Sequence, residues 1–490
     1  MRHFNYQSIS GLIFVLAFLL TSCSDFRNEG KKTGTLPEIY PDYIGVTIPY
    51  NIAPLNFCLK EKNTDAKAIF SGQDKSFEVN AKDGSFSIPE RKWKSLLQSS
   101  VGKKVVVTVY VKKESEWLVY LPFTFQVAAE AIDGFLAYRL IEPGYTLWNK
   151  MGIYQRNLEN FTQSTVYENK MTDGNCVNCH SFCMQNPDKM LFHMRATYPC
   201  TILLDGDKIV KLNTKTEQTI SPLVYPSWHP SSRYIAFSVN KTTQDFHPGQ
   251  RVEVYDTKSD VVVYDNAKQE IVTCSALFSE NAFETFPTFS PDGKTLYFCS
   301  AMAKQMPENI GALKYSLCSI SFEPEKRTFG QKVDTLYSAA VNGKSVAFPR
   351  VSPDGRFLVY TLSDFGTFPI WHDEADLAMV DLKTGKTLDM ETANSDKTDS
   401  YHSWSSNSRW IVFSSRRLDG LYTRPFFAYV DKNGMVAKPF VLPQKKTGFY
   451  SSLMKSYNIP EFITGKIDLN AYKTATMAKK DKGTDLSFVK

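Results

Sequence analysis

The 490-residue chain shows two patterns of apolar and polar positions, and both predict strands. Between residues 37 and 143, short runs alternate apolar and polar side chains, as Lys104 to Val111 does, and turn residues such as Asp83-Gly84 separate the runs. Alternation with a period of two is typical of a strand with one buried face. We therefore predict an all-β fold that begins with a β-sandwich over residues 37–143.

The second pattern is an internal repeat with a period of roughly 50 to 60 residues. Each copy has an aromatic residue followed by Pro or His, a strand, a polar turn and a second strand; the copies are 225–238, 286–298, 348–360 and 401–414. Two weaker strands follow, and four strands per repeat predict the blades of a β-propeller. A further copy begins at residue 179, so residues 179–443 would form five blades. Residues 444–490 would close the ring or dock on the sandwich, so we predict five or six blades.

One short motif indicates a cofactor. Cys176-Val177-Asn178-Cys179-His180 has the C-x-x-C-H spacing of covalent c-type haem attachment. Two thiols at this spacing reach the two vinyl groups of one porphyrin, and the adjacent imidazole becomes the proximal ligand of the iron. A disulfide or half of a zinc site is the alternative, and Cys183 keeps both open, although a zinc site usually needs a second ligand pair at similar spacing. We predict one covalent haem c held by Cys176, Cys179 and His180.

The repeat also suggests a sixth ligand for the iron. Cys179-His180 aligns with Tyr401-His402, whereas the other copies carry proline at that position. The first and last blades of a closed ring are neighbours, so we predict His402 as the sixth ligand. An open sixth position is possible, and so are five competing side chains: Met184, Met190, His193, Met194 and His372.

The N-terminus predicts export. Arg2 and His3 precede an apolar run over residues 11–20, which ends in Leu20-Thr21-Ser22-Cys23. A run of about ten residues is too short to span a bilayer and fits a secretory signal. Its end resembles a lipobox, so residues 1–22 are predicted to be a lipoprotein signal peptide, Cys23 the lipidated residue and residues 23–36 a polar tether. The alternative is an ordinary signal peptide that contains a cysteine.

Composition narrows the class of partner. The net charge of +6 is spread over the chain without a basic block, which excludes nucleic acid as a partner. Residues 144–178 are rich in Arg and aromatic residues, so they are a linker that either walls the haem or contacts the sandwich. Six further cysteines are equally consistent with buried apolar residues and with disulfides: Cys58, Cys183, Cys200, Cys274, Cys299 and Cys318.

The Ser-Pro-Asp-Gly turns at 290–293 and 352–355 resemble those of the TolB-type, WD40-like propeller family, over roughly residues 179–443. The whole chain is similar to TolB-like propeller lipoproteins that carry a C-x-x-C-H motif. The resemblance implies a propeller fold and haem binding at the cell envelope, on either face of the outer membrane. It implies no particular activity, because one fold hosts many functions.

Two functions follow from these observations. The first is electron transfer or redox sensing by a lipid-anchored haem propeller with an unknown redox or envelope partner. The second is a TolB-like module that binds proteins or glycans and in which haem is structural. A peroxidase-like enzyme is a third and weaker possibility, since we find no further distal acid–base pair, no Ser-His-Asp arrangement and no paired carboxylates. The sequence thus favours a protein without catalytic residues.

Overall fold

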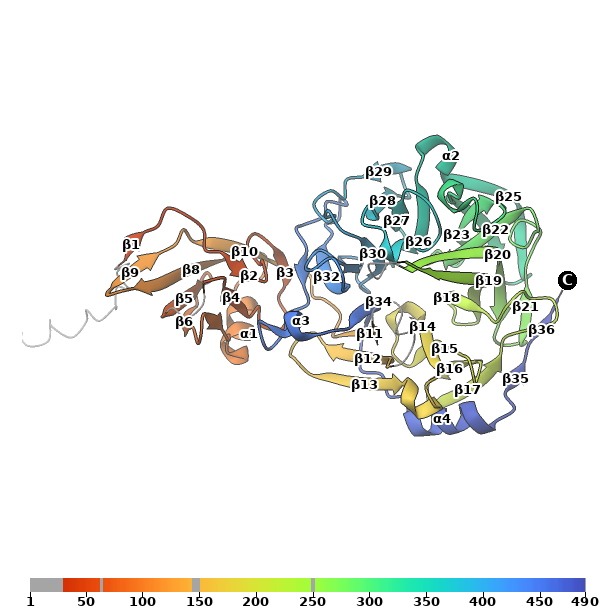
Figure 1. The fold of residues 1–490 in the computed structure, drawn as a ribbon, viewed down its shortest axis with the longest axis horizontal. Coiled ribbons are helices and arrows are strands. Elements are labelled where there is room, and N and C mark those ends of the chain that lie inside the picture. The colour runs from red at the N-terminus through yellow and green to blue at the C-terminus, as the bar shows by residue number, and fades with distance from the viewer. Residues whose placement is uncertain (1–29, 62–64, 143–149, 248–251, 490) are drawn as a thin grey trace, which may run out of the picture.

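The computed structural model describes residues 30–61, 65–142, 150–247 and 252–489, with only the backbone of Cys179. The predicted signal peptide, the predicted lipidation site Cys23 and the first part of the predicted tether lie outside these residues. Among the described residues, no helix has the length and apolar character needed to cross a bilayer. Two parts are visible in Figure 1, an elongated N-terminal domain and a larger disc of sheets beside it.

The N-terminal domain contains a seven-stranded sheet, a three-stranded sheet and helix α1 (Glu90–Ser99). Trp93, Leu96 and Leu97 recur at helical spacing on α1 and are buried, so the helix covers the sheet with one apolar face. Two sheets are what a sandwich requires, but α1 is an addition that the alternating pattern does not predict. The strands are β1 (Lys31–Lys32), β2 (Ile39–Tyr40), β3 (Thr47–Pro49), β4 (Phe57–Leu59), β5 (Ala66–Ser71), β6 (Ser76–Asn80), β7 (Ser85–Phe86), β8 (Lys104–Lys113), β9 (Glu116–Val119) and β10 (Phe123–Ala128).

The rest of the described chain forms six sheets, each with four antiparallel strands of one plan. Five of them follow one another along the chain. Their strands are β14 (Cys176–Phe182), β15 (Lys189–Arg195), β16 (Cys200–Asp205), β17 (Lys208–Asn213); β18 (Val224–Trp228), β19 (Tyr234–Phe246), β20 (Val252–Asp265), β21 (Glu270–Val272); β22 (Ala282–Phe289), β23 (Thr295–Met302), β24 (Ser316–Glu323), β25 (Thr328–Tyr337); β26 (Ser345–Val351), β27 (Phe357–Ser363), β28 (Asp376–Asp381), β29 (Lys386–Leu388); β30 (Asp399–Trp404), β31 (Trp410–Ser415), β32 (Arg424–Tyr429) and β33 (Phe440–Val441).

The sixth sheet combines the two halves of the chain. Its order is β13 (Gln163–Glu168), β12 (Gly152–Asn157), β11 (Phe135–Ile141) and β34 (Ser456–Ile463). The innermost strands of the six sheets contact one another in the order β14, β18, β22, β26, β30, β34 and back to β14, so they form a closed ring (Figure 1). We call the space inside this ring the channel. The predicted all-β class and propeller character are confirmed.

The pairing of β11 with β34 changes the domain boundaries. The predicted boundary at residue 143 falls inside the sixth sheet, and the predicted linker at 144–178 supplies its two outer strands. The residues beyond β34 then follow the outside of the ring. Helix α4 (Ala471–Lys480) leads to β35 (Thr484–Asp485), which pairs with β17, and to β36 (Ser487–Phe488), which pairs with β21.

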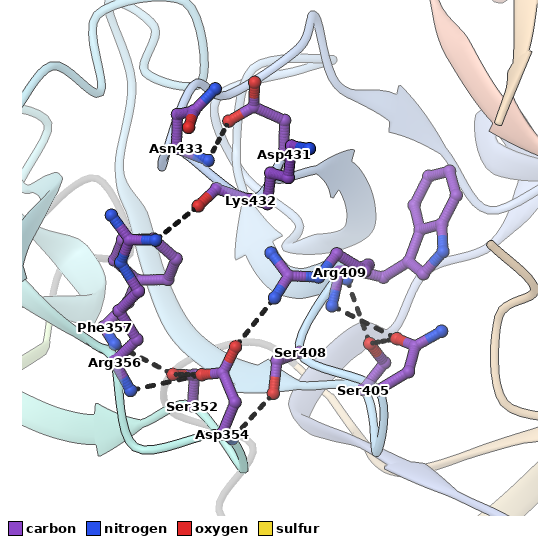
Figure 2. Close-up of polar contacts among 12 residues, drawn as sticks. Ser352, Asp354, Arg356, Phe357, Ser405, Ser408, Arg409, Asp431, Lys432 and Asn433 are labelled. Carbon is purple, nitrogen blue, oxygen red and sulfur yellow. Dashed lines mark hydrogen bonds and ion pairs between the residues drawn. The ribbon is translucent and has the colours of Figure 1, made fainter. Parts of the chain in front are cut away.

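The Ser-Pro-Asp-Gly turns connect neighbouring sheets as well as neighbouring strands. Ser352 Oγ donates to Asp354 Oδ1 at 2.6 Å and accepts the backbone N–H of Phe357 at 2.9 Å, which closes the turn. Asp354 also accepts from Arg409 Nη2 at 2.7 Å, and its N–H donates to Ser408 Oγ at 2.9 Å (Figure 2). Both partners belong to the next blade, so the repeated turn fixes one sheet against another.

Short helices connect the remaining strands. They are η2 (Asn169–Thr172), η3 (Cys183–Gln185), η5 (Ile310–Ala312), α2 (Ala339–Asn342), η6 (Pro369–Trp371) and α3 (Phe449–Ser452). Two of them matter for the channel, because η6 lies at the mouth that receives Cys176 and η3 lies at the opposite mouth. The seven cysteines that the structure describes with side chains all carry free thiols.

Candidate functional site

The six channel strands share one irregularity. In each of them, two consecutive residues stand opposite a single residue of the neighbouring strand. The first residue of the pair has a φ between 46° and 54° in five strands, at Tyr225, Phe286, Phe348, Tyr401 and Ile459. Such a left-handed residue is uncommon outside glycine, and a bulge of this kind re-aims the side chain. By its register, Cys179-His180 is the bulged pair of β14.

The bulge places aromatic rings around the channel. Ring centroids are 4.7 Å apart for Tyr225 and Phe286, 4.6 Å for Phe286 and Phe348, and 4.3 Å for Phe348 and Tyr401. We call these four residues the aromatic collar. His180 lines the same narrow space as the collar, together with Arg350.

Strand β14 runs the length of this channel. Cys176 and Asn178 line a cleft of about 160 Å³ at one mouth, whereas Ser181 and Phe182 line a recess at the other mouth. We call the first the motif cleft. Apart from β14, its walls come from β11, from the β19–β20 hairpin, from η6 and from β34.

His180 is buried without the contacts that a structural histidine usually has. It is 1% exposed, and neither ring nitrogen makes a hydrogen bond of ordinary geometry to a described residue. Burial lowers its pKa to about 3, and the positive charges of Arg139 and Arg350 act in the same direction. A contact with the backbone of Ile459 raises the pKa and offsets this lowering only in part. The imidazole is therefore neutral at physiological pH, which is the form that binds a metal ion.

Cys176 is 3% exposed and lies on an extended strand. At about 3.3 Å per residue, the Cα atoms of residues 176 and 179 are roughly 10 Å apart. A disulfide needs Cα atoms about 4.4–6.8 Å apart, so β14 would have to rebuild to form one. Among the described residues, no group of three or more His, Cys, Asp or Glu could hold a metal ion.

Three arginines give the motif cleft a positive charge: Arg139, Arg195 and Arg416. Arg416 is 2% exposed, donates from Nε to Ile370 O at 2.8 Å and stacks with its guanidinium carbon 3.6 Å from the ring centre of Trp371. Burial lowers the pKa of Arg416 to about 10, so it stays charged. Arg195 Nη2 lies 3.8 Å from Cys176 Sγ. Guanidinium groups of this kind pair well with carboxylates such as porphyrin propionates.

Arg417, which follows Arg416 in the sequence, faces a different environment. Its Nη2 donates to Asp399 Oδ1 at 2.7 Å. Arg416 therefore belongs to the motif cleft and Arg417 to the packing of its own blade.

The structure does not bring His402 to the motif cleft. Its Nε2 donates to the carbonyl of Val359 at 2.9 Å, and in the described part of the chain it lines neither the cleft nor the space beside His180. His402 occupies the same repeat position as His180, but its imidazole lies between two blades.

The competing ligands also have other surroundings. His372 Nε2 lies 2.9 Å from Glu253 Oε1, and His193 Nδ1 lies 3.2 Å from Thr201 Oγ1. Met190 and Met194 are fully buried in an apolar cluster, and Met184 is exposed at the opposite mouth. The methionine that does line the cleft is Met151, whose sulfur accepts the N–H of Val177 at 3.2 Å. Sequence reasoning missed it because its strand neighbours lie in a segment without the repeat pattern.

No protein-family model matches the sequence, and no curated protein matches it. Among solved structures, puromycin hydrolase shows 12% identity and a TM-score of 0.38, over 63% of this chain and 45% of the other. Prolyl oligopeptidase B from Galerina marginata shows 9% and 0.35, over 68% and 42%. A DUF4784 family protein from Bacteroides caccae shows 8% and 0.30, over 72% and 95%. This chain covers less than half of puromycin hydrolase and of prolyl oligopeptidase B, and likeness at this level carries no argument about function.

Proposed function

We propose that this protein binds one haem c covalently through Cys176 and Cys179, with His180 as proximal ligand, in the channel of a six-bladed, TolB-like propeller. Electron transfer or redox sensing in the cell envelope is the function that this site supports best. The observation that carries the proposal is His180, a buried neutral imidazole with two unpaired ring nitrogens beside the motif cleft.

The residues of the chain fit such a group in three respects. His180 offers the lone pair of a neutral imidazole, Arg139, Arg195 and Arg416 offer partners for carboxylates, and the aromatic collar offers apolar surface beside His180. Bound haem supplies a one-electron iron couple, whose potential depends on burial and on the axial ligands. We do not extend the proposal to His402 as sixth ligand, because it would first have to leave the carbonyl of Val359.

The proposed anchor is compatible with this arrangement. Strand β1, the first described element, lies at the end of the N-terminal domain that is remote from the propeller (Figure 1). A lipid on Cys23 would therefore hold the N-terminal domain at the membrane and the propeller away from it. We propose the outer membrane as the location, on its periplasmic face or at the cell surface.

The second candidate is a binding module in which haem is only structural. The channel has a cleft at each mouth, lined by aromatic and charged side chains, and such clefts are typical of ligand sites. If the protein is such a binding module, its protein or glycan partner would bind regardless of the oxidation state of the iron.

A redox titration of the full exported protein, produced in cells that mature cytochromes, separates these functions. Electron transfer predicts reversible reduction with a c-type spectrum and full reoxidation by a soluble acceptor. Cys176→Ala combined with Cys179→Ala should lose the haem stain after denaturing electrophoresis, while Cys200→Ala, a buried cysteine of the same blade, should keep it. Colourless protein from such cells would exclude the proposal. A haem that cannot be reduced reversibly would exclude electron transfer and favour the binding module.

A further inference from the structure

The opposite mouth of the channel has a chemistry that the haem proposal does not use. In each channel strand, the residue that follows the bulged pair lines this mouth. The six residues are Ser181, Ser227, Thr288, Arg350, Ser403 and Glu461. We call the space that they line, about 110 Å³, the distal recess.

Arg350 is the only guanidinium among them, and its ion pair with Glu461 is long. Its Nη2 lies 3.9 Å from Glu461 Oε1, which is too far for a hydrogen bond. Within the described residues, the guanidinium donates no hydrogen bond. Its side chain is 31% exposed, so several N–H donors face the recess.

The neighbouring groups add donors and little negative charge. The hydroxyls of Ser181 and Thr288 have no protein partner among the described residues, while Ser403 Oγ donates to Pro460 O at 3.0 Å. Burial raises the pKa of Glu461 to about 7, against the opposing charge of Arg350. The recess therefore presents a planar set of donors of the kind that binds carboxylates through two hydrogen bonds.

The rim of the recess is apolar. Trp228 and Trp404 use their indole N–H groups on the carbonyls of Ser181 and Arg350, at 3.3 and 3.2 Å, which fixes both rings at the mouth. Phe289 and Phe462 complete the wall. Met184 stands at the rim with 44% exposure and a φ of 48°, a conformation that is unfavourable for methionine.

We propose that the distal recess binds the carboxylate of an acid that carries an apolar group, with the carboxylate on Arg350 and the apolar group against Trp228 and Trp404. The same chemistry is available from a small free acid and from the C-terminus of a peptide. The site is on the opposite side of His180 from the motif cleft, and Arg350 lies between the recess and His180.

Isothermal titration of the full protein with N-acetyl-L-phenylalanine tests this proposal. The acid should bind, and N-acetyl-L-phenylalaninamide should bind about tenfold more weakly or not at all, because it cannot form charge-assisted hydrogen bonds with Arg350. Inorganic phosphate should compete poorly, since it has no apolar group. A tetrapeptide that ends in phenylalanine separates the sources: tighter binding than the small acid indicates a protein C-terminus, and weaker binding indicates a free acid.

Variants assign the binding to the recess. Arg350→Gln should weaken binding of the acid about tenfold, and Glu461→Gln should strengthen it, because the competing carboxylate is removed. Lys304→Gln, which removes one positive charge at an exposed position elsewhere, should leave the affinity unchanged.

Several results would overturn the proposal. Equal binding of the acid and its amide would exclude a carboxylate site, and phosphate binding as tight as that of the acid would exclude the apolar part. If Arg350→Gln does not fold, the comparison of acid and amide on the unmodified protein still decides. Binding that Arg350→Gln leaves intact would place the ligand elsewhere.

Discussion

His180 and His402 occupy the same position of a repeated bulge and have different surroundings. The other four channel strands carry proline there, at Pro226, Pro287, Pro349 and Pro460. His402 uses its Nε2 on Val359 O, whereas neither nitrogen of His180 has a partner among the described residues. A buried polar group without a partner costs stability, so an unpaired imidazole supports the proposed role of His180 as an iron ligand.

This difference gives a matched pair of variants. His180→Pro and His402→Pro both restore the residue of the other blades, so both should fold, with a loss of about 1 kcal/mol for His402→Pro from its hydrogen bond. His180→Pro should lose the Soret band of a ligated c-type haem, and His402→Pro should keep it. The absorption spectrum and the thermal midpoint of each variant measure these effects. A spectrum that changes in His402→Pro would indicate that His402 is a ligand of the iron after all.

Glu284 is a buried residue that the proposed functions do not use. It is 2% exposed, and its Oε2 has no partner among the described residues. Burial, assisted by the negative charge of Asp260, raises its pKa from 4.5 to about 8. Because the folded state holds this proton more tightly than the unfolded state, the residue costs stability as the pH rises from about 4.5 to 8.

Glu284→Gln should therefore stabilise the protein at pH 9, by about 2 kcal/mol, and should have little effect at pH 4. Urea unfolding at the two pH values measures the difference. Glu280→Gln, at a nearby side chain that is 84% exposed, is the control and should change neither value. A Glu284→Gln effect that is equal at both pH values would show that the carboxyl does not titrate in this range.

The channel strands show how far the sequence predicts the elements. The dipeptides Tyr225-Pro226, Phe286-Pro287 and Phe348-Pro349 recur before polar turns, and the blades predicted from them form as expected. Ile459-Pro460 has the same form, but its partner strand β11 lies at the other end of the chain. No local periodicity links two such distant segments, so the predicted boundaries cut through the sixth sheet. For the same reason Met151 was missed, and the side-chain direction of His402 was not predictable from its position.

The C-terminal segment protects the outer edges of two blades. β35 and β36 add parallel strands to β17 and β21, and Leu486 between them is 8% exposed in the apolar cluster of these blades. Covered edges cannot pair with other chains. The segment thus adds stability to the blade that carries the haem motif and to its neighbour.

Leu486→Ala should lower the free energy of unfolding by about 2 kcal/mol, through lost apolar burial. Val489→Ala, three positions further and 37% exposed, should have almost no effect. Chemical unfolding of both variants provides the comparison. Equal stability of the two would mean that the C-terminal strands do not pack on the ring in solution.

At the scale of the whole molecule, the N-terminal domain and the propeller share one apolar cluster, which extends from Trp93 to Trp410. Polar contacts accompany it: Asn56 Nδ2 donates to Gln444 O at 3.2 Å, and Tyr429 OH donates to Glu130 Oε2 at 2.9 Å. A large apolar interface couples domains, whereas a small polar one permits independent motion. The two parts are therefore expected to behave as one unit.

Scanning calorimetry of the full chain should show a single unfolding transition, because neither part can unfold without exposing the shared cluster. Asn56→Ala should move this transition to lower temperature without splitting it. Two separate transitions in the unmodified protein would contradict the shared core.

The central claim is that a haem is covalently bound to β14. Intact-mass spectrometry of the exported protein, purified from cells that mature cytochromes, tests it most directly. The account predicts a mass increase of one haem, which Cys176→Ala combined with Cys179→Ala abolishes and Cys200→Ala retains. A protein of unmodified polypeptide mass, from cells in which a control cytochrome c is matured, would contradict it.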